Sequence, residues 1–126
     1  MMDLEPLALF LGVQVVEAAP ARVVLELAMR PEFATSKGGA HAAVLMALSD
    51  IAGALGTRLN LAAGQRTSTM ESKQNFVGAL EAGVMRAVAE PIHLGARTMV
   101  WRTEVRCGES GRLLAHVVQT QMTLPE

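Results

Sequence analysis

Apolar and polar positions alternate in two different ways along the first thirty residues. In residues 3–11 the apolar side chains recur at helical spacing, which predicts a short amphipathic helix. Residues 12–17 and 21–30 follow on either side of Pro20 and are expected to form two strands. The second strand shows the two-residue period of a half-buried strand most clearly. Its inward positions are Val23, Leu25, Leu27 and Met29.

The middle of the chain has a different pattern. Residues 38–57 contain one charged residue, Asp50, and show no two-residue alternation. A segment that is apolar nearly all round is a buried helix or a membrane span. The membrane interpretation is rejected, because an aspartate near the centre of a span costs about 2.5–3.5 kcal/mol on insertion scales. We therefore expect one long helix at the centre of a small globular fold.

The rest of the chain predicts four strands joined by turns that contain glycine. The connections fall at residues 78–83, 93–96 and 108–111, and all three are expected to be hairpins of an antiparallel meander. The expected strands cover residues 67–77, 83–92, 97–107 and 112–124. Two strands, a helix and four strands form an α+β fold, with the sheet curved around the helix. Either the sheet encloses this helix or a second subunit covers it.

Composition narrows the functional classes. The 126 residues form a single predicted domain, residues 1–126, with 51% apolar residues and a net charge of -1. This balance excludes a disordered chain and disfavours a nucleic-acid partner. One cysteine and three separated histidines predict neither a disulfide nor a metal site. An acidic amino terminus without a signal peptide, and no membrane span, indicate a cytoplasmic protein.

Asp50 is the most informative residue, because it is a lone carboxylate within the most apolar segment. A buried charge requires a partner or a changed protonation state, so such a residue is a candidate for function. Two structural explanations stay open beside the functional one. Asp50 could lie on a solvent-facing stripe of the helix, or it could pair with Arg58 or Arg66.

His41 precedes Asp50 by nine residues and falls near the expected helix start. Nine helical residues advance about 13.5 Å and rotate about 900°, so the two side chains point to opposite sides. Within one chain they do not converge on one small substrate. A twofold dimer with antiparallel helices would bring the helix start of one copy to the aspartate of the other.

A helix start also offers free backbone N–H groups and a partial positive charge. An amide near Ala42 could hold a developing oxyanion, while a facing carboxylate attacks a carbonyl or activates water. This combination is suited to the hydrolysis of an activated acyl compound, and a thioester is the best candidate.

These residues resemble a known family. The stretch of residues 39–53 is similar to the HGG-x6-D/E segment of hotdog-fold acyl-CoA thioesterases, of the phenylacetate-pathway and 4-hydroxybenzoyl-CoA types. Residues 67–76 resemble the family's next strand, which commonly ends in Asn-Phe. The resemblance covers nearly the whole chain from about Gly12. It implies hydrolysis of an acyl-CoA without a cofactor, in a homodimer that pairs again into a homotetramer.

The resemblance also implies individual roles. Asp50 would be the nucleophile or general base, the N–H of Ala42 from the neighbouring subunit would polarise the thioester, and His41 would fix the helix start. Ser68 matches a position whose hydroxyl holds the attacking water, and Thr35 stands where the family has Asn or Gln. The residues expected to bind substrate, mostly along a coenzyme A groove, are Thr35, Ala43, Asn75, Phe76, Val77, Gly78, Gly95, Arg97 and Thr98.

Two departures from the family pattern concern the substrate more than the fold. Ala42 and Ala43 replace the two glycines of the HGG segment, and Val77-Gly78 replaces the Arg-Pro that often follows Asn-Phe. Alanine keeps its N–H, so the oxyanion role survives, but its methyl group narrows the approach of an acyl group. The alternative function is a non-catalytic module that binds acyl-CoA or regulates another protein.

Overall fold

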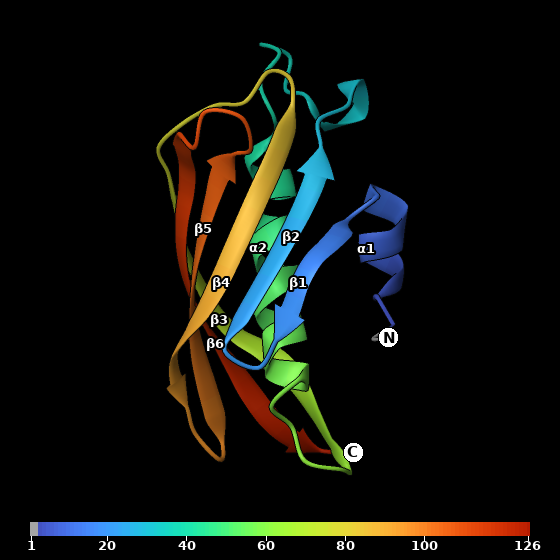
Figure 1. Cartoon of the computed structure of the whole chain (residues 1–126), viewed down its shortest axis with the longest axis vertical. Helices are drawn as coiled ribbons and strands as arrows, with labels where there is room; N and C mark the ends of the chain where they lie inside the picture. The colour runs from blue at the N-terminus through green and yellow to red at the C-terminus, as the bar shows by residue number, and fades with distance from the viewer. Residues whose placement is uncertain (1–2) are drawn as a thin grey trace.

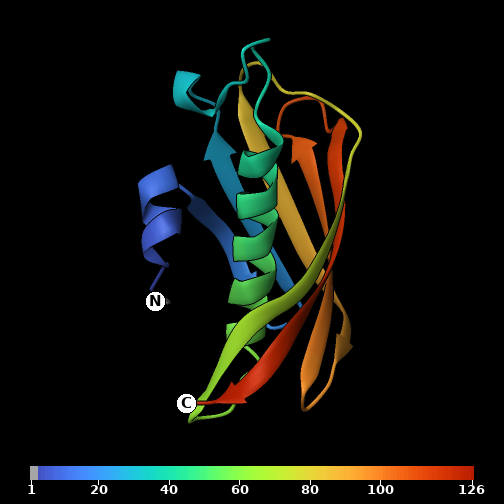
Figure 2. The ribbon, with the colours of Figure 1, turned by 180° about the vertical axis from the view of Figure 1, so that it is seen from behind.

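The computed structural model describes residues 3–126 and contains one curved antiparallel sheet and one long helix. The helices are α1 (Pro6–Leu11) and α2 (Ala42–Arg58), with a 3-10 turn at Pro31–Phe33. The strands are β1 (Gln14–Ala19), β2 (Arg22–Ala28), β3 (Gln65–Phe76), β4 (Val84–Leu94), β5 (Thr98–Cys107) and β6 (Leu113–Pro125). Figure 1 shows α2 lying along the inner face of the sheet, and Figure 2 shows the same helix from its uncovered side.

The order of strands corrects the expected meander. The sheet runs β1-β2-β4-β5-β6-β3, so β3 pairs with β6 and stands at an edge. The expected hairpin at residues 78–83 is therefore wrong. This segment instead crosses the end of the sheet from β3 to β4, and its Leu80 is buried with its carbonyl accepting the Ala40 N–H. The meander is limited to β4, β5 and β6.

The core lies between the inner face of the sheet and α2. The two-residue pattern of β2 is confirmed for Val23, Leu25 and Leu27, which are buried. It is wrong for Met29, which follows the strand and is half-buried, and Val24 on the opposite face is buried as well. Strand β5 buries Met99, Trp101, Thr103 and Val105. The short amino-terminal helix is only partly as expected. It begins at Pro6, it buries Ala8 and Leu11, and Leu7 is exposed.

Two glycines of α2 allow the sheet to approach the helix closely. A methyl group at Gly53 would overlap the carboxamide of Gln119 on β6, and one at Gly56 would lie about 2.5 Å from the ring of Trp101 on β5. Glycine within a helix lowers stability by about 1 kcal/mol relative to alanine. Here it makes room for the large inward side chains of β5 and β6.

The side of α2 that faces away from the sheet is uncovered. Met46 is 44% exposed, and Asp50 and Ala54 follow it on the same side of the helix, half-buried. No helix in the described residues combines the length and the hydropathy needed to cross a membrane. The apolar helix is thus buried on its sheet side and open along a narrow stripe that contains one carboxylate.

Candidate active site

Asp50 opens on a cavity of about 520 Å³ between α2, β3 and the end of β6. Asp50, Ala54 and Arg58 line it from α2, at the spacing of four residues that places side chains on one helix face. The hydroxyl of Thr69 on β3 donates a hydrogen bond of 2.6 Å to Oδ1 of Asp50. The carboxylate is therefore neither alone nor fully buried, and it faces open space.

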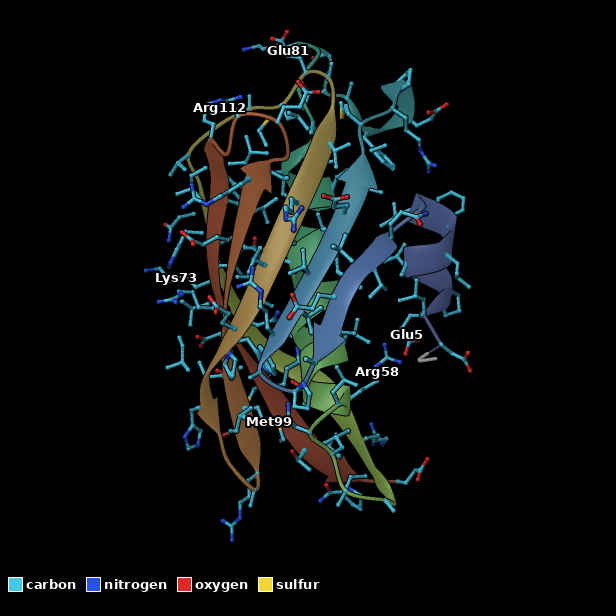
Figure 3. All side chains as sticks on the ribbon, in the orientation of Figure 1. Glu5, Arg58, Lys73, Glu81, Met99 and Arg112 are labelled. Carbon is cyan, nitrogen blue, oxygen red and sulfur yellow. The ribbon has the colours of Figure 1, made fainter. Side chains whose placement is uncertain are left out.

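The structural explanations for Asp50 from the sequence are only partly met. Asp50 does lie on the uncovered stripe, but within residues 3–126 no ion pair joins it to Arg58 or Arg66. Arg58 instead pairs with Glu5 at 3.4 Å, and Figure 3 shows these two side chains next to each other. The cavity is thus bordered by an ion pair that leaves Asp50 without a cationic partner in the described chain.

His41 is the residue that caps α2. Its backbone is extended, with φ -63° and ψ 139°, and its Nδ1 accepts the N–H of Ala43 at 3.0 Å. The His41 N–H donates to the carbonyl of Phe33 at 2.7 Å. Since Nδ1 acts as an acceptor, the neutral imidazole carries its proton on Nε2. These contacts join the preceding loop to the helix start, and Ala42 becomes the first helical residue.

The N–H of Ala42 has no acceptor within the described residues, as is usual for the first N–H of a helix. Because His41 lies outside the helix, the relevant separation is the eight residues from Ala42 to Asp50, about 12 Å along the axis. One carbonyl group cannot contact both groups of one chain over that length. The Ala42 N–H and the Asp50 side chain are thus kept apart by their distance along the helix axis. The half-turn rotation expected between His41 and Asp50 is not what separates them.

Strand alternation separates Thr69 from Ser68. Thr69 and Thr67 share the inner face of β3 with α2, and both contact Gln121 of β6. Ser68 pairs with Met122, so its side chain points toward the outer face of the sheet, although the residue borders the cavity. The hydroxyl that contacts Asp50 is that of Thr69, and the expected role of Ser68 in holding water stays a prediction.

The other expected substrate residues fall into two groups at opposite ends of the sheet. Asn75 pairs with His116, and the N–H groups of Val77 and Gly78 donate to the Leu114 carbonyl near the start of β6. Phe76, which is 42% exposed, belongs to this group, and exposed Ala43 lies near the same end. The loop before the helix, including Thr35, is tied to this end through Ala40 and Leu80.

The second group lies near Asp50. The Gly95 N–H donates to the carbonyl of Thr98, the Arg97 carbonyl accepts the N–H of Thr123, and Thr98 pairs with Met122 near the end of β6. Six residues of strand separate His116 from Met122, which is about 20 Å. One chain therefore does not bring both groups to one site.

Thr35 has a local role in the loop. Its hydroxyl accepts the Lys37 N–H at 3.2 Å, and its own N–H donates to the Gly39 carbonyl at 2.7 Å. The side chain is thereby engaged in the turn that precedes α2, and Thr35 does not line the cavity of Asp50.

Three polar residues at the site were missed by sequence reasoning, namely Thr69, Gln119 and Gln121. Gln119 and Gln121 are 1% and 0% exposed on the inner face of β6. The sequence does contain a signal for them, because they continue the inward register of Ala115 and Val117. Polar residues at core positions of a strand need hydrogen-bond partners, and that requirement points to a built site.

Other titratable groups do not form a second centre. No group of three or more His, Cys, Asp or Glu side chains suited to a metal ion occurs among residues 3–126. Hydrogen bonds from the side chain and backbone of Ser110 and from the Glu109 backbone hold the pKa of Cys107 below its ordinary value. Cys107 ends β5 and does not border the cavity of Asp50.

Comparison with known proteins places the chain in a family. Residues 37–114 match the thioesterase superfamily. The 1,4-dihydroxy-2-naphthoyl-CoA hydrolase of Listeria monocytogenes is 24% identical over 95 residues, which cover 75% of this chain and 77% of that protein. The Escherichia coli hydrolase of the same name is 33% identical over 81 residues, which cover 64% of this chain and 56% of that protein.

Solved structures give the same fold. A thioesterase from Haemophilus influenzae superposes with a TM-score of 0.88 at 22% identity, covering 94% of this chain and 82% of that chain. The chain belongs to the thioesterase superfamily and has the hotdog fold. It is a thioester hydrolase, so the expected class of enzyme is confirmed and the alternative of a non-catalytic module is not supported.

Proposed function

We propose that this protein hydrolyses an acyl-CoA thioester to a free acid and coenzyme A, and that Asp50 performs the attack or activates the attacking water. The observation that carries this function is the position of Asp50, on the uncovered stripe of an otherwise apolar helix and open to a cavity of about 520 Å³. Two relatives bear the name of a hydrolase of 1,4-dihydroxy-2-naphthoyl-CoA, which supports a CoA thioester as substrate.

Two routes use the same carboxylate. As general base, Asp50 takes a proton from water while the water oxygen bonds to the thioester carbon. The tetrahedral intermediate then expels sulfur, and the proton passes to the thiolate. As nucleophile, the Asp50 carboxylate bonds to the thioester carbon and expels the thiolate, which leaves a mixed anhydride. Water then hydrolyses the anhydride to the free acid, regenerates the Asp50 carboxylate and supplies the proton taken up by the thiolate. Both routes place negative charge on the carbonyl oxygen, which needs a hydrogen-bond donor.

The partner's Ala42 in a homodimer supplies that donor. The N–H of Ala42 is free within the described chain, stands at the positive end of α2, and lies about 12 Å along the axis from Asp50 of its own chain. An antiparallel second copy brings a free N–H to each Asp50 and forms two identical sites.

The exposed residues fit this twofold arrangement. If Ala42 of one protomer faces Asp50 of the other, the axis passes midway between them, beside Met46, which is 44% exposed. The edge strand β3 has an unpaired side and keeps Met70 and Phe76 exposed. A long unpaired edge with apolar side chains is a surface that a second strand covers. Pairing of two such dimers into a tetramer stays a prediction.

The same arrangement reunites the two groups of expected substrate residues. The first group, around Asn75 and Gly78, lies at the helix-start end of its chain, and the turn with Gly95 and Arg97 lies at the Asp50 end. In the antiparallel dimer, the helix-start end of one copy meets the Asp50 end of the other. Coenzyme A would then pass both groups at the interface, with Arg97 available to its phosphates.

Replacement of Asp50 tests the role of the carboxylate. Asp50→Asn keeps the shape and removes the charge, so thiol release from acyl-CoA substrates should fall about 100-fold to 10,000-fold. Glu126→Gln is the matched control, because Glu126 borders the same cavity and has no assigned role. A folded Asp50→Asn protein that releases thiol at the wild-type rate would contradict the proposed function.

Ala42→Pro tests the partner's donor within the same experiment. Proline fits the first helical position and lacks an N–H, and the extended backbone of His41 suits the residue before proline. Neither variant alone should be active, but a mixed dimer carries one intact site. Random mixing of equal amounts should restore about a quarter of wild-type activity. If no activity returns although mixed dimers form, the site lies within one chain.

A further inference from the structure

A continuous chain of hydrogen bonds connects the backbone of α2 with the Asp50 side chain. Gln119 Nε2 donates to the Ser49 carbonyl at 2.8 Å, and Gln121 Nε2 donates to Gln119 Oε1 at 2.8 Å. Gln121 Nε2 also donates to Thr69 Oγ1 at 2.7 Å, and Thr69 donates to Asp50 Oδ1 at 2.6 Å. The chain starts and ends on neighbouring residues of α2 and passes through β6 and β3.

The Ser49 carbonyl fixes the direction of every bond in this chain. A carbonyl oxygen only accepts, so the amide nitrogen of Gln119 must face it, and Oε1 of Gln119 must face Gln121. Gln121 then presents its own nitrogen to Gln119 and to Thr69. Because Thr69 Oγ1 accepts a hydrogen bond from Gln121, the Thr69 hydroxyl hydrogen is available for a hydrogen bond to Asp50.

We propose that Gln119, Gln121 and Thr69 position the Asp50 carboxylate, with Oδ1 held by Thr69 and Oδ2 presented to water or to the thioester. This role rests on the proposed function of Asp50. The two glutamines are buried, so the chain cannot exchange its bonds readily with solvent. Within the described residues, Oδ2 has no hydrogen-bond partner, which leaves it available for the reaction.

Within residues 3–126, no charged side chain forms an ion pair with Asp50. The remaining charged groups that border the cavity are Glu5 near α1, Arg58 on α2, Arg66 on β3 and Glu126 after β6. Arg58 is paired with Glu5, and none of the four forms an ion pair with Asp50. The orientation of the Asp50 carboxylate thus depends on the neutral Thr69 hydroxyl. The hydrogen bonds of Gln119 and Gln121 determine where that hydroxyl points.

Matched threonine variants test this role. Thr69→Val removes the hydroxyl at nearly constant shape and should lower kcat about tenfold to 100-fold, the range for a hydrogen bond to a charged group. KM should stay close to the wild-type value, because Thr69 positions Asp50 and does not bind substrate. Thr69→Ser, which keeps the hydroxyl, should restore kcat.

Thr103→Val is the structural control. Thr103 also lies on the inner face of the sheet, it is fully buried, and its hydroxyl has no partner in the described chain. The same substitution there should leave kcat and KM unchanged. Thr69 is exposed, so its variants should fold, and circular dichroism verifies this. Gln121→Met should also lower kcat, because the Thr69 hydroxyl loses the hydrogen bond from Gln121 that orients it toward Asp50.

The outcomes separate the positioning role from the proposed function. If Asp50→Asn is inactive and Thr69→Val has the wild-type kcat, the positioning role is overturned and the role of Asp50 stands. Equal losses in Thr69→Val and Thr103→Val would also overturn it, because they would reflect packing alone. If Asp50→Asn stays active, the proposed function itself fails. If Gln121→Met does not fold, the Thr69 pair decides.

Discussion

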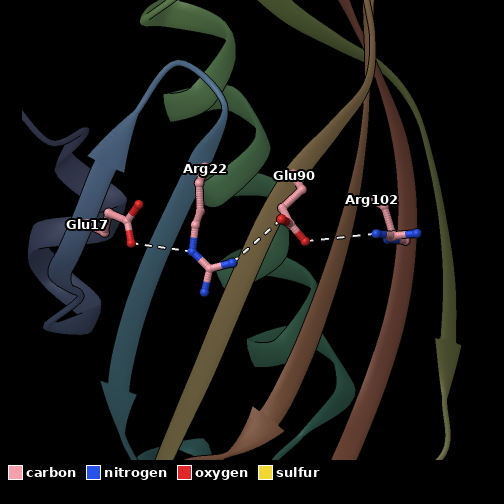
Figure 4. Close-up of polar contacts among 4 residues, drawn as sticks. All are labelled: Glu17, Arg22, Glu90 and Arg102. Atoms are coloured by element: carbon pink, nitrogen blue, oxygen red, sulfur yellow. Dashed lines mark hydrogen bonds and ion pairs between the residues drawn. The ribbon is translucent and has the colours of Figure 1, made fainter.

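A row of charged side chains crosses the outer face of the sheet, whereas the inner face next to Asp50 contains neutral amides and hydroxyls. On the outer face, Arg22 contacts Glu17 at 3.3 Å and Glu90 at 3.5 Å, and Glu90 contacts Arg102 at 3.8 Å. Figure 4 shows this row of ion pairs, which runs from Glu17 on β1 to Arg102 on β5. On the inner face, Gln119 and Gln121 connect α2 to Thr69.

The difference between these two regions follows from their exposure to water. The side chains of the outer row are 42–51% exposed, so water competes with each ion pair and reduces its value. The inner amides are fully buried, so a bond lost there leaves an unpaired polar group. The outer row can change with little consequence, but the inner chain must keep one geometry, which makes it suitable for holding a reactive carboxylate.

The two helix glycines provide the strongest way to break the inner region. Gly56→Ala would place a methyl group about 2.5 Å from the buried Trp101 ring, which has little freedom to move. Overpacking of this kind should lower the free energy of unfolding by about 1–3 kcal/mol, measured by urea denaturation. The kcat of the folded fraction should stay near wild type, because Trp101 is outside the chain of bonds to Asp50.

Gly53→Ala should lower activity as well as stability. The methyl group would overlap the end of the Gln119 side chain and displace it. The displacement separates the buried Gln119 amide from the Ser49 carbonyl, so kcat should fall about tenfold, and the unpaired amide should lower the free energy of unfolding by about 1–3 kcal/mol. Equal kcat values in the two variants would show that Gln119 does not act on Asp50.

The contrast between local and non-local contacts also explains which features the sequence predicted. The apolar stretch around Asp50 predicted the central helix, and the alternation in β2 predicted a buried face, because both patterns depend on near neighbours in sequence. The pairing of β3 with β6 joins residues about fifty positions apart, such as Thr69 and Gln121. A glycine-containing connection after β3 resembled a hairpin, and no local pattern distinguished it from a crossover.

The helix residues of the candidate site were predictable from the sequence, and the strand residue that contacts Asp50 was not. Asp50 stood out because a charge in an apolar helix is visible in one segment. The start of α2 was expected near His41, and the helix begins at Ala42. Thr69 was not identified, because its contact with Asp50 depends on which face of an edge strand points inward. That choice is fixed by the register with β6, and it favours Thr69 over the adjacent Ser68.

Thr103→Val is expected to have a smaller, stabilising effect. Its buried hydroxyl has no partner within residues 3–126, and removal of an unpaired buried polar group is favourable. The free energy of unfolding should rise by about 1 kcal/mol in urea denaturation. A destabilised variant would indicate that this hydroxyl has a partner, such as a buried water, and that the inner face is polar beyond the chain that ends at Asp50.

Glu90→Gln should have the smallest effect, although it removes the partner of both Arg22 and Arg102. Exposed ion pairs contribute about 0.2–1 kcal/mol each, and the two arginines regain hydration when the carboxylate is lost. The decrease in unfolding free energy should therefore stay below about 1 kcal/mol at low salt. At 1 M salt, where the screening length is about 3 Å, wild type and variant should unfold at the same urea concentration. A loss that persists at high salt would mean that the outer row is held as rigidly as the inner chain, and the distinction between the two faces would then have to rest on something other than their exposure to water.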